Sequence, residues 1–262
     1  MAFQTEKALV QAYHAALDAA DWGAAAQHVA PDCLWRGYHP FNEMTSPDQV
    51  VTRFWQPLHD SLSSMQRRED IFFAGLNEID GFTSTWVVSM GHLVGLFDAP
   101  WLGIPPTGRM AFLRYCTFLR VEGDRIAEIA MYFDIPHLMV QAGLSPMPNQ
   151  TAAHLVQPGP MTHDGLIRGP QPAVEGTATL AAINAMIGDL GNWDLGLPLE
   201  EELRRTWAED MIWWGPTGIG ATYTIPRYAA QHAGPFRATF TDRKFNGHRA
   251  RLAEGHFGGF FG

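Results

Sequence analysis

The spacing of apolar residues changes from helical to strand-like within the first half of this 262-residue chain. Leu9, Tyr13 and Leu17 recur every four residues, as on one face of a helix. From about Glu69 onward the period shortens to two, so that one strand face carries Trp86, Val88, Met90, His92, Val94 and Leu96. Helices followed by a long antiparallel meander predict an α+β domain of about 140 residues. We expect its curved sheet to wrap the helices and leave a pocket on the concave side.

Local signals suggest where these elements begin. Thr5 and Asp21 precede helical patterns and are expected to cap them. Ser46-Pro-Asp-Gln49 combines a cap residue, a proline at the first helical position and an amide three residues later. Two further strands, 109–121 and 125–134, are expected to form a hairpin that turns at Gly123-Asp124.

Short segments of the first half recur in the same order in the second half. Asp32 and Trp35 recur as Asp210 and Trp213, and Gly91-His92 recurs as Gly255-His256. A helical face also returns, carried by Leu180, Ile183, Ile187 and Leu190. The shared order predicts an internal duplication. Only six residues follow His256, so the second copy is expected to lack its C-terminal strands.

A proline-rich stretch separates the two predicted copies. Six prolines lie between Leu144 and Gly176, and this density favours an extended segment. The sequence therefore predicts a first domain at 1–145, a linker or arm at 146–172, and a second, incomplete domain at 173–262.

Composition excludes several function classes. The net charge of −9 and the lack of a basic cluster longer than two arginines disfavour a nucleic-acid partner. No apolar run approaches the ~20 residues that span a bilayer, and no secretory leader is visible at the N-terminus. Cys33 and Cys116 are too few for a disulfide framework and are expected to be buried free thiols. A cytoplasmic protein without a membrane partner is the expectation.

An ordered set of motifs resembles the SnoaL-like polyketide cyclases of the NTF2-like superfamily. The set comprises Asp-x-x-Trp, Gly91-His92, the stretch Gly103-Ile-Pro-Pro-Thr-Gly-Arg109, the hairpin from Arg120 to Glu128, and Asp134-Ile-Pro136. The resemblance covers nearly all of the first copy and the front of the second. It implies two cone-shaped α+β domains, each with N-terminal helices and a curved antiparallel sheet.

The acid–base positions that the resemblance implies hold other residues. In the cyclases an aspartate lies three residues after the hairpin glutamate and a histidine lies on the partner strand; the matching positions here are Met131 and Thr117. Neither side chain is a useful proton acceptor. Two hypotheses remain open: an enzyme that uses another base on a carbonyl compound, or a non-catalytic ligand-binding or dimerisation module.

His92 and Asp134 are the candidate catalytic residues. His92 sits on an apolar strand face, either as a pocket base, since histidine is the usual side chain for proton transfer near neutral pH, or as a satisfied core histidine. Asp134 lies either at the pocket rim or at the cap of a helix that begins at Pro136. Arg109 either binds an acidic ligand or forms a structural ion pair, and Glu128 is expected to pair with a basic residue on the sheet surface.

Aromatic residues are expected to line the pocket. The expected lining is Trp35, Tyr38, Trp55, Trp86, Trp101, Arg109, Tyr115, Thr117, Met131 and Phe133, with Trp213 and His256 as second-copy equivalents. Such a lining suits a small apolar or aromatic ligand, although an ordinary aromatic core is the alternative. The histidine spacing favours no metal, no stretch matches a phosphate-binding loop, and no cofactor is expected. The two copies are expected to pair within the chain or to form a homo-oligomer.

Overall fold

The computed structural model describes residues 2–154, 156–191 and 196–262. The first half contains helices α1 (Gln4–Asp18), α2 (Trp22–Gln27), α3 (Pro47–Val50), α4 (Gln56–Ser61) and α5 (Ile135–Gln141), with a π-helical turn η1 (Val51–Trp55) and a 3-10 turn η2 (Glu78–Asp80). Its strands are β1 (Val29–Arg36), β2 (Glu43–Met44), β3 (Leu62–Leu76), β4 (Thr85–Phe97), β5 (Met110–Glu122) and β6 (Arg125–Phe133). The helices precede the long strands, which confirms the α+β prediction.

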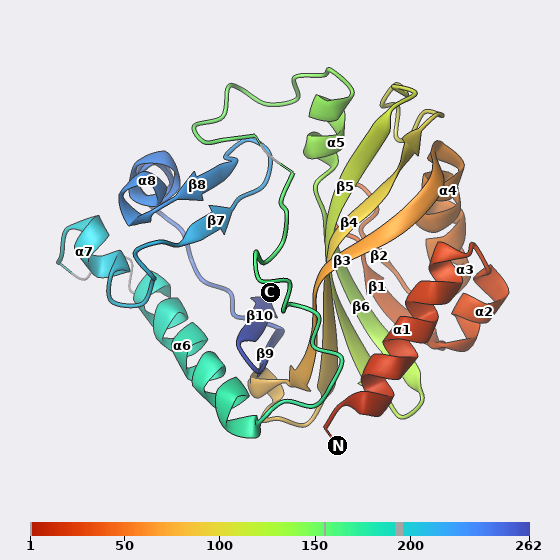
Figure 1. Ribbon diagram of the computed structural model, residues 1–262, viewed down its shortest axis with the longest axis horizontal. Helices are drawn as coiled ribbons and strands as arrows, with labels where there is room; N and C mark the ends of the chain where they lie inside the picture. The colour runs from red at the N-terminus through yellow and green to blue at the C-terminus, as the bar shows by residue number, and fades with distance from the viewer. Residues whose placement is uncertain (1, 155, 192–195) are drawn as a thin grey trace.

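The six strands form one sheet in the order β2-β1-β6-β5-β4-β3. The long strands β3 to β6 pair antiparallel with their neighbours, whereas β1 lies parallel to β6. Figure 1 shows α1 to α4 on one side of this sheet and the second half of the chain on the other. We call the side that faces α1 to α4 the inner face and the opposite side the outer face.

The predicted caps are partly correct. Asp21 accepts a hydrogen bond from the backbone N–H of Ala24, and Asp134 accepts one from His137, so both residues cap helices. Ser46 occupies the predicted position before α3 but makes no side-chain cap bond. The Thr5 prediction is wrong, because α1 already begins at Gln4 and encloses Thr5.

Strand β3 begins at Leu62, seven residues earlier than the expected Glu69. The register between β3 and β4 shifts twice, between Ser63 and Gln66 and between Glu69 and Ile71. An extra residue in one strand moves each following side chain to the other face. These irregularities interrupt the alternation of apolar and polar residues, so the sequence pattern does not reveal the N-terminal part of β3.

The inner face of the sheet and the helices enclose the main core. It consists mostly of aliphatic and aromatic side chains, among them Leu17, Phe54, Leu93, Leu113 and Leu138. Its aromatic residues come from both layers, among them Tyr13 of α1, Phe54 of η1 and Tyr115 of β5, so the helices and the sheet are held together by shared burial.

A second core lies on the outer face. Phe73, Trp86, Val88 and Phe118 of the sheet are covered there by residues from beyond position 166, including Leu252 and Phe261. Both faces of β4 are therefore buried, whereas the sequence pattern suggested one apolar face. The second half of the chain supplies the cover that makes this possible.

The second half forms small pieces around that cover. Its helices are α6 (Ala173–Gly191), α7 (Leu199–Leu203), α8 (Ile225–Tyr228) and α9 (Gly234–Thr239), with a π-helical turn η3 (Ala229–Ala233). Its strands are β7 (Ile212–Trp214), β8 (Ala221–Tyr223), β9 (Ala250–Glu254) and β10 (Phe257–Phe261). In the described part of this half, β7-β8 and β9-β10 are separate two-stranded sheets and not the single curved sheet that was expected.

The free edge of β3 is covered by two other segments. Leu166 pairs with Phe72 in a parallel bridge, and Glu254 accepts a hydrogen bond from the backbone N–H of Ala74. The same Glu254 carboxylate pairs with the buried ammonium of Lys7 at 2.6 Å. An open edge strand invites pairing with other chains, so these contacts protect the sheet. Within the described ranges, no helix has the length and apolar character needed to traverse a bilayer.

Candidate functional site

The inner core leaves almost no empty space. Trp35 packs against Phe54 with ring centroids 5.2 Å apart, and Phe54 also contacts Trp55, Trp101 and Phe133. The cavity between the helices and the sheet measures about 20 Å³. That volume holds at most one water molecule, far below the ~300 Å³ of a typical ligand pocket. The aromatic residues therefore form a packed core in this structure.

Seven of the predicted pocket residues do face this core. They are Trp35, Trp55, Trp101, Tyr115, Met131 and Phe133 and the buried polar residue Thr117. Thr117 and Met131 lie directly opposite each other on β5 and β6. The two positions that the resemblance marks for acid–base groups are thus neighbours, and neither side chain titrates in the useful range.

His92, Trp86 and Tyr38 lie outside the inner core, which corrects their expected place in one pocket. Trp86 belongs to the outer core, and His92 shares its strand face. Tyr38 stacks on Tyr132, with ring centroids 4.3 Å apart and a hydroxyl hydrogen bond of 2.5 Å. The inward positions of β4 are instead Val87, Ser89, Gly91 and Leu93, because side chains alternate along a strand.

His92 lies in a buried polar contact at the outer face. Its Nδ1 is 3.5 Å from Oδ2 of Asp70, and its ring meets Phe112 edge-on. Its Nε2 is buried without a hydrogen-bond partner among the described residues. His92 therefore has a titratable neighbour, but on the side of the sheet opposite to the inner core.

The other predicted residues have structural places. Asp134 caps α5 and also accepts a hydrogen bond from the backbone N–H of Thr217. Arg109 is exposed at the turn before β5. Glu128 binds Arg36 at 2.7 Å, as expected for a pair on the sheet surface. Capping by Asp134 and ion pairing by Glu128 are thus confirmed.

Of the two residues expected to be second-copy equivalents, Trp213 and His256, the second does not occupy a position like that of its counterpart. Trp213 stacks on His232 at 4.3 Å within a small separate core. His256, however, lies in the exposed turn between β9 and β10, whereas His92 lies in the middle of β4. The two Gly-His pairs therefore occupy different local structures.

A bulge in β3 brings together polar residues that the sequence pattern does not connect. Asp70 is the extra residue between the pairs Glu69–Gly91 and Ile71–Met90. A side-chain carbon on Gly91 would lie 1.9 Å from the carbonyl oxygen of Arg68, so only glycine fits opposite the bulge. Because of the bulge, Glu69 points inward toward His14, while Asp70 points outward toward His92.

On the inner side of the bulge, four side chains form a hydrogen-bonded chain. Oε1 of Glu69 lies 3.3 Å from Nδ1 of His14 and accepts a hydrogen bond of 2.8 Å from Ser89. The Ser89 hydroxyl is also 2.9 Å from the hydroxyl of Tyr115. These groups come from α1, β3, β4 and β5 and are nearly buried.

Burial and charge set the protonation of this chain. Burial, aided by the nearby Arg67, lowers the pKa of His14 below its usual 6.5. Burial alone would raise the pKa of Glu69, but hydrogen bonds from His14 and Ser89 and the charge of Arg67 bring that pKa below its usual value. A neutral imidazole beside an ionised carboxylate follows at neutral pH. Burial also raises the pKa of Tyr115 to about 12, so this phenol stays protonated.

Arg67 closes the inner end of the chain. It binds Asp18 of α1 through two hydrogen bonds of 3.0 and 3.3 Å. Its guanidinium also lies over the rings of Tyr115 and Trp55, at 5.1 and 5.7 Å from their centroids. Stacking and a two-point carboxylate bond fix this arginine in place.

This hydrogen-bonded chain of side chains borders a groove of about 630 Å³ along α1 and the edge of β3. The groove is lined by Gln11, His14, Ala15, Asp18, Arg67, Arg68, Glu69, Asp70, Leu166 and Arg168. The sequence motifs described above do not single out His14. A signal was present, because His14 falls on the buried face of α1 with Val10, Tyr13 and Leu17, where an unpaired polar group is costly.

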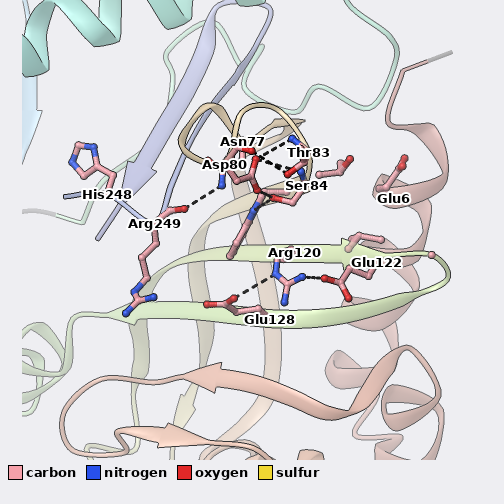
Figure 2. A pocket seen from close by; sticks show the side chains of 14 residues that line it. Glu6, Asn77, Asp80, Thr83, Ser84, Arg120, Glu122, Glu128, His248 and Arg249 are labelled. Atoms are coloured by element: carbon pink, nitrogen blue, oxygen red, sulfur yellow. Dashed lines mark hydrogen bonds and ion pairs between the residues drawn. The ribbon is translucent and has the colours of Figure 1, made fainter.

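A second hollow of about 800 Å³ lies at the hairpin end of the sheet (Figure 2). Its charged groups largely satisfy one another. Arg120 pairs with both Glu122 and Glu128, and Asp80 accepts hydrogen bonds from Thr83 and Ser84 (Figure 2). Metal-ligand clusters of three or more His, Cys, Asp or Glu side chains do not occur in the described part of the chain. The groove beside His14 is the better candidate site, since it is lined by a histidine whose Nδ1 contacts the Glu69 carboxylate.

Comparison with known proteins gives one family match. The family model of the SnoaL-like domain matches residues 10–129. No curated protein sequence is significantly similar to the chain.

Several solved structures resemble about half of the chain. AclR of Streptomyces galilaeus is 19% identical with a TM-score of 0.44, covering 55% of this chain and 88% of its own. An NTF2-like protein of Burkholderia thailandensis is 20% identical with a TM-score of 0.40, covering 53% and 97%. IdmH of Streptomyces antibioticus, assigned to the polyketide cyclases, is 18% identical with a TM-score of 0.43, covering 52% and 96%.

Proposed function

We propose that the region matched by the SnoaL-like family model, residues 10–129, transfers protons on a small organic carbonyl compound, with His14 as the general base. The observation that carries the proposal is the chain from Ser89 through Glu69 to His14, which ends at an accessible groove. The site uses residues other than Thr117 and Met131, so it departs from the acid–base positions of the cyclases.

The geometry gives each residue a role. Nδ1–H of His14 donates a hydrogen bond to the Glu69 carboxylate, which leaves the lone pair of the ring on Nε2. No hydrogen bond ties this Nε2 to a described residue, and His14 lines the groove. Nε2 is therefore available to remove a proton from a carbon next to a carbonyl group or from a water molecule. Ser89 holds Glu69 in position and is itself held by Tyr115.

The proposal is tested by proton exchange, which requires no knowledge of the natural substrate. The purified full chain would be incubated in deuterated buffer with a panel of enolisable ketones and β-keto esters, and exchange followed by NMR. His14→Asn is expected to lower the exchange rate by about 10²–10⁴-fold, the usual contribution of a general base. The wild-type rate should level off at a pH below 6.5, because burial lowers the pKa of His14.

His39→Asn is the matched control. His39 is exposed and lies outside the groove, so its replacement should leave exchange unchanged. Glu69→Gln should slow exchange, because an amide no longer selects one tautomer of His14. Equal rates for the wild type and His14→Asn on every compound would refute the role of His14.

The second candidate function is a ligand-binding module without catalysis. The filled inner core and the side chains at Thr117 and Met131 favour it. A compound that binds the wild type and His14→Asn equally, with no exchange in either, would support this module and contradict the enzyme.

A further inference from the structure

Two arginines that line the same groove as His14 point to the chemistry of the ligand. We propose that the ligand of this groove carries an anionic group, a carboxylate or a phosphate, bound between Arg68 of β3 and Arg168 of the proline-rich segment. The inference rests on the groove proposed above as the site. It adds a ligand class and brings a residue from outside positions 10–129 into the site.

The charges that line the groove do not all cancel. Arg67 is bound by Asp18, and Glu69 is bound by His14 and Ser89. Asp70 lies against His92 on the outer face. Arg68 has no hydrogen bond or ion pair from its side chain to the described residues.

Arg168 is also available. Its Nη2 lies 3.8 Å from Oε2 of Glu69, which is a charge contact but longer than a hydrogen bond. Its side chain is 60% exposed. Two guanidinium groups thus line the same groove: Arg68 has no ion pair among the described residues, and Arg168 has the long contact to Glu69. Guanidinium donors match carboxylate and phosphate oxygens in a two-point geometry.

The backbone around Arg168 is fixed, so the arginine is held at the groove. The backbone N–H of Phe72 donates to the carbonyl of Gly165, and that of Ile167 donates to the carbonyl of Phe72, both at 2.7 Å. A side-chain carbon on Gly165 would lie 2.3 Å from the carbonyl oxygen of Asp70. The proline-rich segment therefore lies tightly against the bulge, and its Leu166 and Arg168 line one side of the groove.

This placement predicts how the site recognises its ligand. An anion between Arg68 and Arg168 would lie in the groove that His14 also lines. The remainder of the molecule could then extend along Ala15 and Leu166. Anion binding would also weaken as salt is added, because partly exposed charges are screened.

The test uses three probes of similar size: benzoate, phenyl phosphate and neutral benzamide. Each would be titrated into the full chain at low ionic strength, with binding followed by calorimetry and by NMR shifts of the His14 ring. We expect the anions to bind and benzamide not to bind. Whichever anion binds more tightly identifies carboxylate or phosphate as the natural group.

Arg168→Gln and Arg68→Gln should each weaken anion binding at least tenfold. Arg53→Gln is the matched control, because Arg53 is exposed on η1 and does not line the groove. Binding of benzamide as tight as that of the anions, or anion binding that survives both arginine replacements, would overturn the inference.

The outcomes separate this inference from the proposed function. Anion binding that depends on the arginines, without His14-dependent exchange, would support the ligand class and refute the base. Exchange that depends on His14, with anion binding insensitive to both arginines, would support the base and refute the ligand class.

Discussion

Residues 32–61 and 210–239 build the same order of elements in very different surroundings. Each stretch contains a strand with tryptophan, a short second strand, and a helix that is interrupted by a π-helical turn. The three helical pieces are four, five and six residues long in both stretches. A constant 178 residues separate them, from Trp35 to Trp213 and from Pro47 to Ile225. This agreement favours the internal duplication, which stays a prediction.

The surroundings differ in what covers the tryptophan. Trp35 is 1% exposed inside the core of a six-stranded sheet and contacts Phe54. Trp213 is only half-buried and stacks on His232, which stands 178 residues after Phe54. The local fold thus forms with or without a full sheet above it. The sequence of each stretch sets its local structure, and the sheet sets how deeply the stretch is buried.

The sharpest test of this contrast replaces each tryptophan. Trp35→Ala should lower the free energy of unfolding by about 3–5 kcal/mol, as for other large core truncations. Trp213→Ala should cost about 1–2 kcal/mol, because its ring is partly in water. Urea unfolding followed by circular dichroism measures both, with Trp35→Phe as a milder substitute if Trp35→Ala does not fold. An equal or larger loss at Trp213 would break the comparison.

A smaller effect is expected at the glycines that follow the tryptophans. A side-chain carbon on Gly37 would lie 1.8 Å from the Trp35 ring, and one on Gly215 would lie 2.1 Å from the Trp213 ring. Gly37→Ala and Gly215→Ala should each cost about 1–3 kcal/mol, because the rings must move. Gly188→Ala in α6 is the control: its added carbon meets nothing within 4 Å, so thermal melting should show no loss. Tolerance of alanine at 215 alone would mean that the shared geometry is not needed in the second stretch.

The smallest effect concerns His232, the counterpart of Phe54. Burial lowers the pKa of His232 below 6.5. The folded state then binds fewer protons than the unfolded state, so stability is present above pH 6.5 and is lost as the pH falls through the lowered pKa. His232→Phe should remove this loss and add up to about 1 kcal/mol at acidic pH. Melting curves between pH 4 and 8 check the result, and an unchanged pH dependence would count against His232.

The sequence pattern was a good guide where one local signal decides the structure. The helices, the long strands, the turn at Gly123-Asp124 and the cap at Asp134 all depend on neighbours within four residues. The position of β3 was harder to predict, because its bulge breaks the alternation.

The candidate site could not be found by the same means. His14 and Glu69 are 55 residues apart, and the bulge decides which of Glu69 and Asp70 points inward. The face of His92 was misjudged for a related reason. Both faces of β4 are buried, one by residues from beyond position 166, and a single strand cannot indicate which side holds the helices.

The buried Lys7–Glu254 pair has a consequence for any attempt to dissect the molecule. A fragment that ends near residue 145 would keep Lys7 but lose its counter-charge, and a buried charge without a partner costs several kcal/mol. It would also lose the cover over Phe73, Trp86 and Phe118. The proline-rich segment looks like a boundary in the sequence, yet it separates two parts that depend on each other. We therefore expect that the region matched by the SnoaL-like family model, residues 10–129, does not fold stably on its own.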